Sequence, residues 1–155
     1  MVRSSKIIAT FFGLGYAPVA PGTFGALGGL FISFLLLKSG LDFTTFYVIH
    51  IFIIVLSFFA GTFACKKLSG EWGHDPSKVV IDETLGFWIS ILFLPLNVQT
   101  LIGGFILFRF FDIVKPLGIR KIDNLNSPYA VMLDDVLAGI YANLVLQAVH
   151  RILLV

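Results

Sequence analysis

Charged residues are scarce in this chain. They make up 13% of its 155 residues, against 57% hydrophobic residues, whereas soluble domains average about 25% charge. The mean hydropathy of +0.96 likewise indicates a strongly apolar chain. This composition excludes an ordinary soluble domain and predicts one membrane-embedded domain, 1–155. Because the net charge is only +2 and no basic run is interleaved with aromatic residues, nucleic acid is not expected as a partner.

Cysteine is rare, and several catalytic signatures are missing. The single cysteine, Cys65, excludes an intramolecular disulfide. The sequence has no Cys-x5-Arg loop, no Asp-x-Asp-x-Thr and no Gly-x4-Gly-Lys-Ser/Thr. No Ser-His or Cys-His pair is visible either, so activation of a side-chain nucleophile by histidine is not indicated.

Long apolar runs are abundant. They cover residues 24–37, 43–65 and 131–155. The second and third reach the roughly 20 residues that a helix needs to cross about 30 Å of hydrocarbon. The first follows Pro21-Gly22, and Thr23 is the expected N-cap of its helix. Gly25 and Gly29 form a GxxxG, which predicts close helix packing. The basic N-terminus predicts a short interfacial helix.

The stretch 84–108 admits two interpretations, because Pro95-Leu96-Asn97 interrupts it. Arg3 and Lys6 place the N-terminus inside, so the loop with Lys66, Lys67 and Lys78 also faces inside. A single span would put the next four cations outside: Arg109, Lys115, Arg120 and Lys121. A helical hairpin keeps them inside. We therefore expect an all-α membrane bundle of about three full spans and a short helical hairpin.

The hairpin brings the acidic residues together. Asp82 and Glu83 precede its turn by about as many residues as Asp112 follows it, so antiparallel helices place them at a similar depth. Asp134 and Asp135 begin the last run from the same side. An ionised carboxylate at membrane depth is costly and is usually functional. The five acids are therefore expected to converge at the cytoplasmic face.

A divalent cation would allow these acids to coexist in ionised form, because neighbouring carboxylates raise one another's pKa. Oxygen ligands without a cysteine cluster favour Mg²⁺ or Mn²⁺ over zinc. The alternative for Asp112 is simple ion pairing, since Arg109 and Lys115 flank it at i−3 and i+3.

Beside such a metal, Arg109 and Lys115 suit a phosphate monoester. Thr23 could bind an anion at a helix N-terminus, although a plain helix cap is the simpler interpretation. His74 is expected to be a loop histidine, with acid–base catalysis as the alternative.

Four separated motifs resemble the bacterial phosphatidylglycerophosphatase A family, in the same order over nearly the whole chain. They are Ala20-Pro21-Gly22-Thr23-Phe24-Gly25; Asp75-Pro76 with Val80-Ile81-Asp82-Glu83-Thr84-Leu85-Gly86; Phe108-Arg109-Phe110-Phe111-Asp112-Ile113-Val114-Lys115-Pro116; and Asp134-Asp135-Val136-Leu137-Ala138-Gly139. Ile81 departs from the family, some members of which have an aromatic residue there; this affects packing more than catalysis.

The resemblance implies a Mg²⁺-dependent phosphatase of the bacterial cytoplasmic membrane, with its active site facing the cytoplasm, that converts phosphatidylglycerophosphate to phosphatidylglycerol. By motif, the metal and catalytic carboxylates would be Asp82, Glu83, Asp112, Asp134 and Asp135, with Asp82, Asp112 or Asp135 as an alternative nucleophile to water. Thr23, Arg109 and Lys115 would bind the phosphate. The expected partners are the phospholipid substrate and the bilayer; the sequence does not define an oligomeric state.

Two other classes of function compete with this interpretation. A small ion or proton transporter would line its path with intramembrane acids, but a path needs polar groups through the midplane rather than at one interface. A structural subunit of a larger membrane complex would leave the paired acids unexplained.

Overall fold

The computed structural model describes residues 2–73, 77–125 and 127–153. Its regular elements in this part of the chain are all helical, which confirms the predicted all-α class. In chain order they are α1 Val2–Ala9, the 3₁₀ helix η1 Leu14–Tyr16, α2 Pro21–Lys38, α3 Phe43–Trp72, α4 Ile81–Ser90, α5 Val98–Val114, α6 Ile119–Asp123 and α7 Ala130–Leu153. The predicted N-terminal helix is present as α1. His74 lies outside the described residues.

Three helices, α2, α3 and α7, are long and apolar enough to cross a membrane. They correspond to the three apolar runs of the sequence. α3 extends to Trp72, beyond the predicted end at Cys65. At about 1.5 Å per residue its 30 residues measure about 45 Å, so one end projects beyond a hydrocarbon layer of about 30 Å.

The start of α2 differs from the prediction. Ala20 is the N-cap residue, in a left-handed conformation with φ 48°, and Pro21 occupies the first helical position. Thr23 is therefore not the cap, and lies in the first turn, where its N–H bonds to the Ala20 carbonyl at 2.9 Å. Proline begins the helix here because its missing N–H would have had no helical partner.

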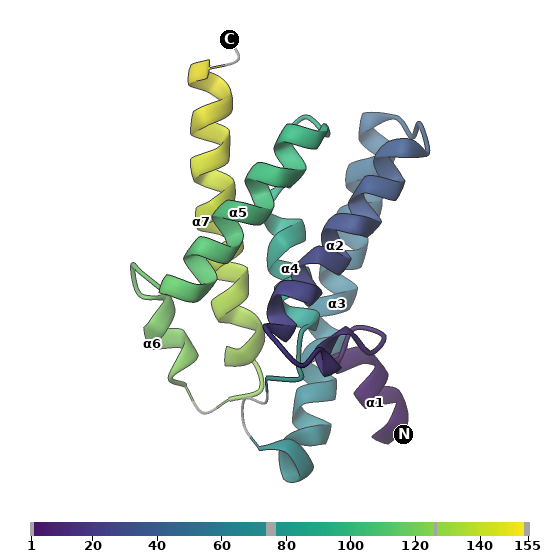
Figure 1. Ribbon diagram of the computed structural model, residues 1–155, viewed down its shortest axis with the longest axis vertical. Coiled ribbons are helices and arrows are strands. Elements are labelled where there is room, and N and C mark those ends of the chain that lie inside the picture. The colour runs from purple at the N-terminus through teal and green to yellow at the C-terminus, as the bar shows by residue number, and fades with distance from the viewer. Residues whose placement is uncertain (1, 74–76, 126, 154–155) are drawn as a thin grey trace.

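The stretch 84–108 is a hairpin, as predicted from the placement of charge. α4 ends at Ser90 and α5 begins at Val98. In Figure 1, α4 rises through the middle of the bundle and α5 descends beside α7. The side chain of Asn97 caps α5 by accepting a 2.8 Å bond from the Thr100 N–H. With 10 residues α4 is too short to cross a bilayer alone, and α5, with 17, is at the lower limit.

Side chains from the long helices satisfy the carbonyls of the hairpin turn. Asn143 on α7 donates to the carbonyls of Ser90 at 3.1 Å and Leu92 at 2.8 Å. Tyr47 on α3 donates to the carbonyl of Leu94. A broken helix is tolerated at membrane depth only when its freed backbone groups find such partners. These bonds therefore fix the depth of the hairpin.

α4 is the central element of the bundle (Figure 1). Most of its residues are buried, and it packs between α2 and α7. The GxxxG of α2 allows the close approach that was predicted, because a Cβ on Gly25 would lie 2.6 Å from the Val80 carbonyl oxygen. Thr84 donates to the carbonyl of Gly25 at 2.8 Å, and Trp88 donates to that of Gly29 at 3.1 Å.

The crossing of α4 and α7 is equally tight. A Cβ on Gly139 would lie 2.4 Å from the backbone oxygen of Gly86, and one on Gly86 would lie 2.7 Å from the Asp135 backbone oxygen. These contacts involve backbone, so a side chain can be accommodated only if the helices separate. The crossing holds the acidic start of α7 against the acidic start of α4.

We predict that Gly139→Ala destabilises the protein by about 1–3 kcal/mol, the usual cost of overpacking. Gly70→Ala is the matched control, because a Cβ there meets nothing within 4 Å; it should be neutral or slightly stabilising, as alanine favours helix over glycine by roughly 0.5–1 kcal/mol. Thermal unfolding in detergent measures both variants. Equal unfolding midpoints would show that α4 and α7 can separate freely.

Candidate active site

The five predicted acids converge at one end of the bundle. They line a cavity of about 230 Å³ where α4 and α7 begin and α5 ends. Its lining residues are Ser77, Val79, Asp82, Glu83, Asp112, Lys115, Val131, Asp134 and Asp135. Since one water occupies about 30 Å³ of liquid, the cavity has room for an ion, waters and a phosphate group. We call this region the carboxylate site.

Three of the acids form a tighter group. Asp82 and Glu83 of α4 and Asp135 of α7 each offer a carboxylate oxygen, and these oxygens all lie within 4.8 Å of one another. Asp82 and Asp135 are buried. Burial, followed by the neighbouring charge of Asp82, raises the pKa of the Glu83 carboxyl well above its usual range. Such crowding of like charges is unfavourable without a cation.

The other two acids are held in ion pairs. Asp112 pairs with Arg109 one helical turn earlier, the alternative that the sequence left open. Asp134 accepts a 2.7 Å bond from Lys115. The sequence suggested that Lys115 would neutralise Asp112, but the described structure pairs it with Asp134 and Asp123 instead. The five acids therefore divide into a group of three and two cation-bound residues.

Lys115 occupies a constrained position at the end of α5. It is the C-cap residue, left-handed with φ 48°, and its ammonium group also contacts Asp123 at 2.5 Å. Burial disfavours its charge, but the hydrogen bonds that it donates to Asp123 and Asp134 outweigh burial and raise its pKa. Asp123 was not predicted as a site residue. In the sequence, Asp123 is distinguished only by being an acidic residue shortly after the motif that contains Lys115.

The start of α2 also approaches the site. A Cβ on Gly22 would lie 2.1 Å from Glu83 Oε1 and 3.2 Å from Arg109 Nη1. Thr23, the predicted phosphate ligand, is half-buried in the same turn but is not among the described residues that line the cavity. Gly22 was not predicted as a site residue, because Pro21-Gly22 was interpreted only as the segment that precedes the helix. Ser77, which supplies a hydroxyl at the cavity, was not predicted either.

The residues present suit a hard divalent cation. The group of three offers oxygen ligands only, the donor type that Mg²⁺ prefers. Glu83 Oε2 and Asp134 Oδ1 are buried and have no hydrogen-bond partner among the residues that the structure describes, and a buried acceptor left unsatisfied costs about 1–3 kcal/mol or more. A cation beside Glu83 would satisfy one of these oxygens.

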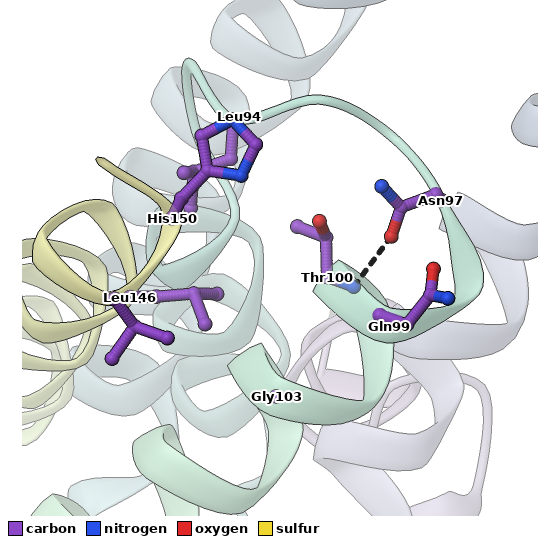
Figure 2. A pocket seen from close by; sticks show the side chains of 8 residues that line it. Leu94, Asn97, Gln99, Thr100, Gly103, Leu146 and His150 are labelled. Atoms are coloured by element: carbon purple, nitrogen blue, oxygen red, sulfur yellow. Dashed lines mark hydrogen bonds between the residues drawn. The ribbon is translucent and has the colours of Figure 1, made fainter. Parts of the chain in front are cut away.

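A second and larger cavity lies at the other end of α5 and α7. It measures about 430 Å³ and has a mostly apolar lining that includes Leu94, Leu146 and Val149. Figure 2 shows the Asn97–Thr100 capping bond on its rim, with the His150 ring near Leu94. None of the described residues that line it carries a carboxylate. Despite its size, it therefore lacks the groups needed for metal-assisted chemistry.

The fold and the site together define a helical membrane enzyme with a carboxylate centre at one end of its bundle. The sequence profile of the phosphatidylglycerophosphatase A family matches residues 7–150. The chain belongs to this family, as its four motifs indicated, and it is a phosphatase that acts on phosphate monoesters.

Three relatives cover most of the chain. A Bacteroides thetaiotaomicron protein, whose name provisionally describes a phosphatidylinositol-3-phosphatase, is 47% identical over 94% of this chain and 92% of its own. Proteins named phosphatidylglycerophosphatase A are 38% identical in Haemophilus influenzae, over 97% and 91%, and 34% identical in Escherichia coli, over 86% and 76%. No solved structure matches the chain significantly. The relatives and the three long helices support a bacterial membrane protein.

We predict that Gly22→Ala lowers phosphatase activity by roughly 100-fold, because the added methyl group displaces Glu83, and misplacement by about 1 Å can cost that much. Gly28→Ala is the control on the same helix: a Cβ there also crowds side chains, with Leu14 Cδ1 at 2.7 Å, but the nearest residues, Leu14 and Phe11, do not line the carboxylate site. Steady-state phosphate release measures both. Normal turnover by a folded Gly22→Ala protein would show that Glu83 need not occupy its present position.

Proposed function

We propose that this phosphatase hydrolyses phosphatidylglycerophosphate to phosphatidylglycerol and phosphate with the help of Mg²⁺, in phosphatidylglycerol synthesis. The observation that supports it most directly is that carboxylate oxygens of Asp82, Glu83 and Asp135 lie within 4.8 Å of one another. They line a 230 Å³ cavity together with Lys115, and Arg109 pairs with Asp112, another lining residue. Family membership supplies the substrate class. The geometry supplies a physical reason why the reaction would occur at this end of the bundle.

Asp82, Glu83 and Asp135 are the proposed metal ligands. When bound there, Mg²⁺ would polarise a phosphoryl oxygen and lower the pKa of a coordinated water. Asp112 and Asp134 contribute in a different way, because their ion pairs hold Arg109 and Lys115 at the cavity. The sequence placed all five acids in one metal set; we now propose separate roles for the two groups.

Arg109 and Lys115 are the proposed phosphate-binding residues. Arg109 keeps a buried Nε without a hydrogen-bond partner, and its guanidinium can donate to phosphate oxygens in a fork geometry. The Lys115 ammonium has three donors and uses two of them on Asp123 and Asp134. Both cations would neutralise the charge that develops on the phosphoryl oxygens during transfer.

Hydrolysis needs one bond to form and one to break. A water oxygen forms a bond to phosphorus, and the ester bond between phosphorus and the glycerol oxygen breaks. The proton lost by the water goes to a carboxylate of the site, and that carboxylate passes the proton to the glycerol oxygen as it leaves. Asp134 Oδ1 is buried without a hydrogen-bond partner and is our candidate acceptor. Direct attack by Asp82, Asp112 or Asp135 is the alternative route.

The relatives carry two substrate names, and both describe a phosphate monoester on a lipid headgroup. The activity assay should therefore compare phosphatidylglycerophosphate with phosphatidylinositol 3-phosphate, using purified protein in detergent. We expect the first to be hydrolysed with the higher kcat/KM. The reverse preference would move the substrate assignment to the inositol lipid while leaving the carboxylate site unchanged.

We predict that chelation abolishes phosphate release and that added Mg²⁺ restores it. Asp135→Asn should raise the Mg²⁺ concentration for half-maximal activity by at least about tenfold, the lower range seen when groups around a metal ligand are lost. Asp112→Asn is the matched control, since it changes the same functional group outside the group of three. We expect it to raise the KM for substrate instead, through Arg109.

Full turnover in chelator would exclude the metal site. Identical Mg²⁺ dependence in Asp135→Asn, Asp112→Asn and the unmodified chain would contradict the proposed division of the five acids. Thermal unfolding in detergent shows whether each variant is folded.

We also propose that the carboxylate site faces the cytoplasm of a bacterial inner membrane. The positive-inside rule supports this orientation. In Figure 1, α1, α6 and the C-terminal end of α3 lie at the same end of the bundle as the start of α4, and these segments contain Arg3, Lys66, Lys67, Arg120 and Lys121. A substrate in the cytoplasmic leaflet could then reach the cavity laterally, without moving its charged headgroup through the bilayer.

Cysteine labelling in intact cells tests this orientation. In a Cys65→Ala background, Lys78→Cys and Lys121→Cys should resist a membrane-impermeant thiol reagent. Ser39→Cys, at the opposite end of α2, should react; it is preferred to its neighbour Gly40, whose φ of +70° strains any side chain. Labelling at position 78 or 121 without labelling at position 39 would reverse the orientation.

A further inference from the structure

A cavity of about 390 Å³ lies at the same end of the bundle but shares no lining residue with the carboxylate site. It is formed by α1 and the turn that follows it. Its lining residues are Arg3, Lys6, Ile7, Thr10, Phe12, Gly13 and Tyr16. We call it the N-terminal pocket. Nothing in the proposed reaction uses it.

The pocket combines positive charge with exposed aromatic rings. Arg3 is exposed, and the Lys6 side chain keeps 31% of its surface accessible although it pairs with Glu71. Phe12 is 81% exposed and Tyr16 is 55% exposed. Cations beside aromatic side chains on a short amphipathic helix are typical of a segment that lies at a membrane interface and binds anionic lipids.

The exposed Phe12 ring is held in place by its backbone. Phe11 and Phe12 both have positive φ, 43° and 58°, a left-handed conformation that costs roughly 1–2 kcal/mol per non-glycine residue. Phe11 points inward and packs against Trp88, with 6.0 Å between ring centroids. Thr10 fixes the turn by donating to the Lys6 carbonyl at 2.7 Å and accepting from the Gly13 N–H at 3.0 Å. The turn therefore displays one ring outward while it buries the other.

A second aromatic group lies next to the cations. The Lys6 ammonium is 5.6 Å from the ring centroid of Trp72, and the Lys78 ammonium is 5.8 Å from the same ring. Only one carboxylate in the described contacts, Glu71, balances these two lysines. Positive charge is therefore in excess around the pocket, in contrast to the carboxylate site, where acids exceed cations.

We propose that the N-terminal pocket binds the phosphate headgroup of an anionic phospholipid of the bilayer. Arg3 and Lys6 contact the phosphate, and the Phe12 and Tyr16 rings lie among the upper parts of the acyl chains. The pocket shares no lining residue with the carboxylate site, so the proposed lipid binding does not depend on the proposed reaction.

The elements that form the N-terminal pocket contact the segment that leads into the carboxylate site, so a lipid bound there would also affect that segment. The Val80 N–H donates to the Ala9 carbonyl at 2.9 Å, and Gly15 packs against the backbone of Lys78. The segment that leads into Asp82 and Glu83 is therefore attached to α1 and its turn. An anionic lipid that anchors α1 at the interface also anchors the entrance to the carboxylate site.

Trp72 provides a direct test, because the only other tryptophan, Trp88, is 3% exposed. We would reconstitute Trp88→Phe protein in vesicles and compare fluorescence quenching by dibrominated phosphatidylserine and dibrominated phosphatidylcholine. Phosphatidylserine is anionic but carries no phosphate monoester. We expect it to quench Trp72 preferentially. Arg3→Gln/Lys6→Gln should reduce this preference by up to about fivefold for each lost cation.

Two controls separate a specific site from general attraction. Lys66→Gln/Lys67→Gln removes the same charge from exposed positions on α3, and Glu71→Gln breaks the Lys6 ion pair without removing a cation. Both should keep the preference. An equal loss in the two double variants, or a loss in Glu71→Gln equal to that in Arg3→Gln/Lys6→Gln, would overturn the proposal, as would complete reversal by millimolar inorganic phosphate.

The quenching preference of Trp72 can be tested independently of the phosphatase assignment. Asp82→Asn should retain the full quenching preference while it loses activity, because Asp82 lies outside the pocket. If Trp88→Phe does not fold, the Trp72 contribution is obtained by subtracting the quenching of Trp72→Phe from that of the unmodified chain. No preference for the anionic lipid in either form would exclude the site.

Discussion

The unfavourable free energy of gathering carboxylates at one end of an apolar bundle governs much of this structure. Asp82, Glu83 and Asp135 bring oxygens within 4.8 Å of one another, and like charges at that distance resist ionisation. The protein pairs Asp112 with Arg109 and Asp134 with Lys115. The group of three is where we propose that a divalent ion binds. The fixed cations and the proposed metal would thus both offset the repulsion between neighbouring carboxylates.

The hairpin is what makes this arrangement possible in a chain of 155 residues. A single helix through 84–108 would have placed the acids of α4 and α5 at opposite faces. Breaking it exposes backbone carbonyls at depth, and Tyr47 and Asn143 satisfy these. Glycine contacts among α2, α4 and α7 then bring the helix starts close together. Polar bonds and small residues in the apolar region therefore position charged groups at its edge.

The helices and the convergence of the five acids were predicted well from the sequence, because both follow from composition and residue spacing. Apolar runs located α2, α3 and α7, and cation placement with Pro95 indicated the hairpin. The partner of each charge was harder to predict. Lys115 lies three residues after Asp112, yet it bonds to Asp134, 19 residues away. Its left-handed backbone at the end of α5 turns it toward α7. Residue spacing along a helix does not predict such a turn.

At the start of α2, the local capping preference and the packing against distant residues favour different first residues of the helix. Capping preference favoured Thr23, but Pro21 takes the first helical position and Ala20 the strained cap. The earlier start places Gly22 against Glu83 and Arg109, where a methyl group would not fit. A helix N-terminus carries a partial positive charge, so this placement directs favourable backbone dipoles at the acids. The unfavourable cap conformation is thus offset by electrostatic stabilisation of the carboxylate site, which links the first motif of the chain to the other three.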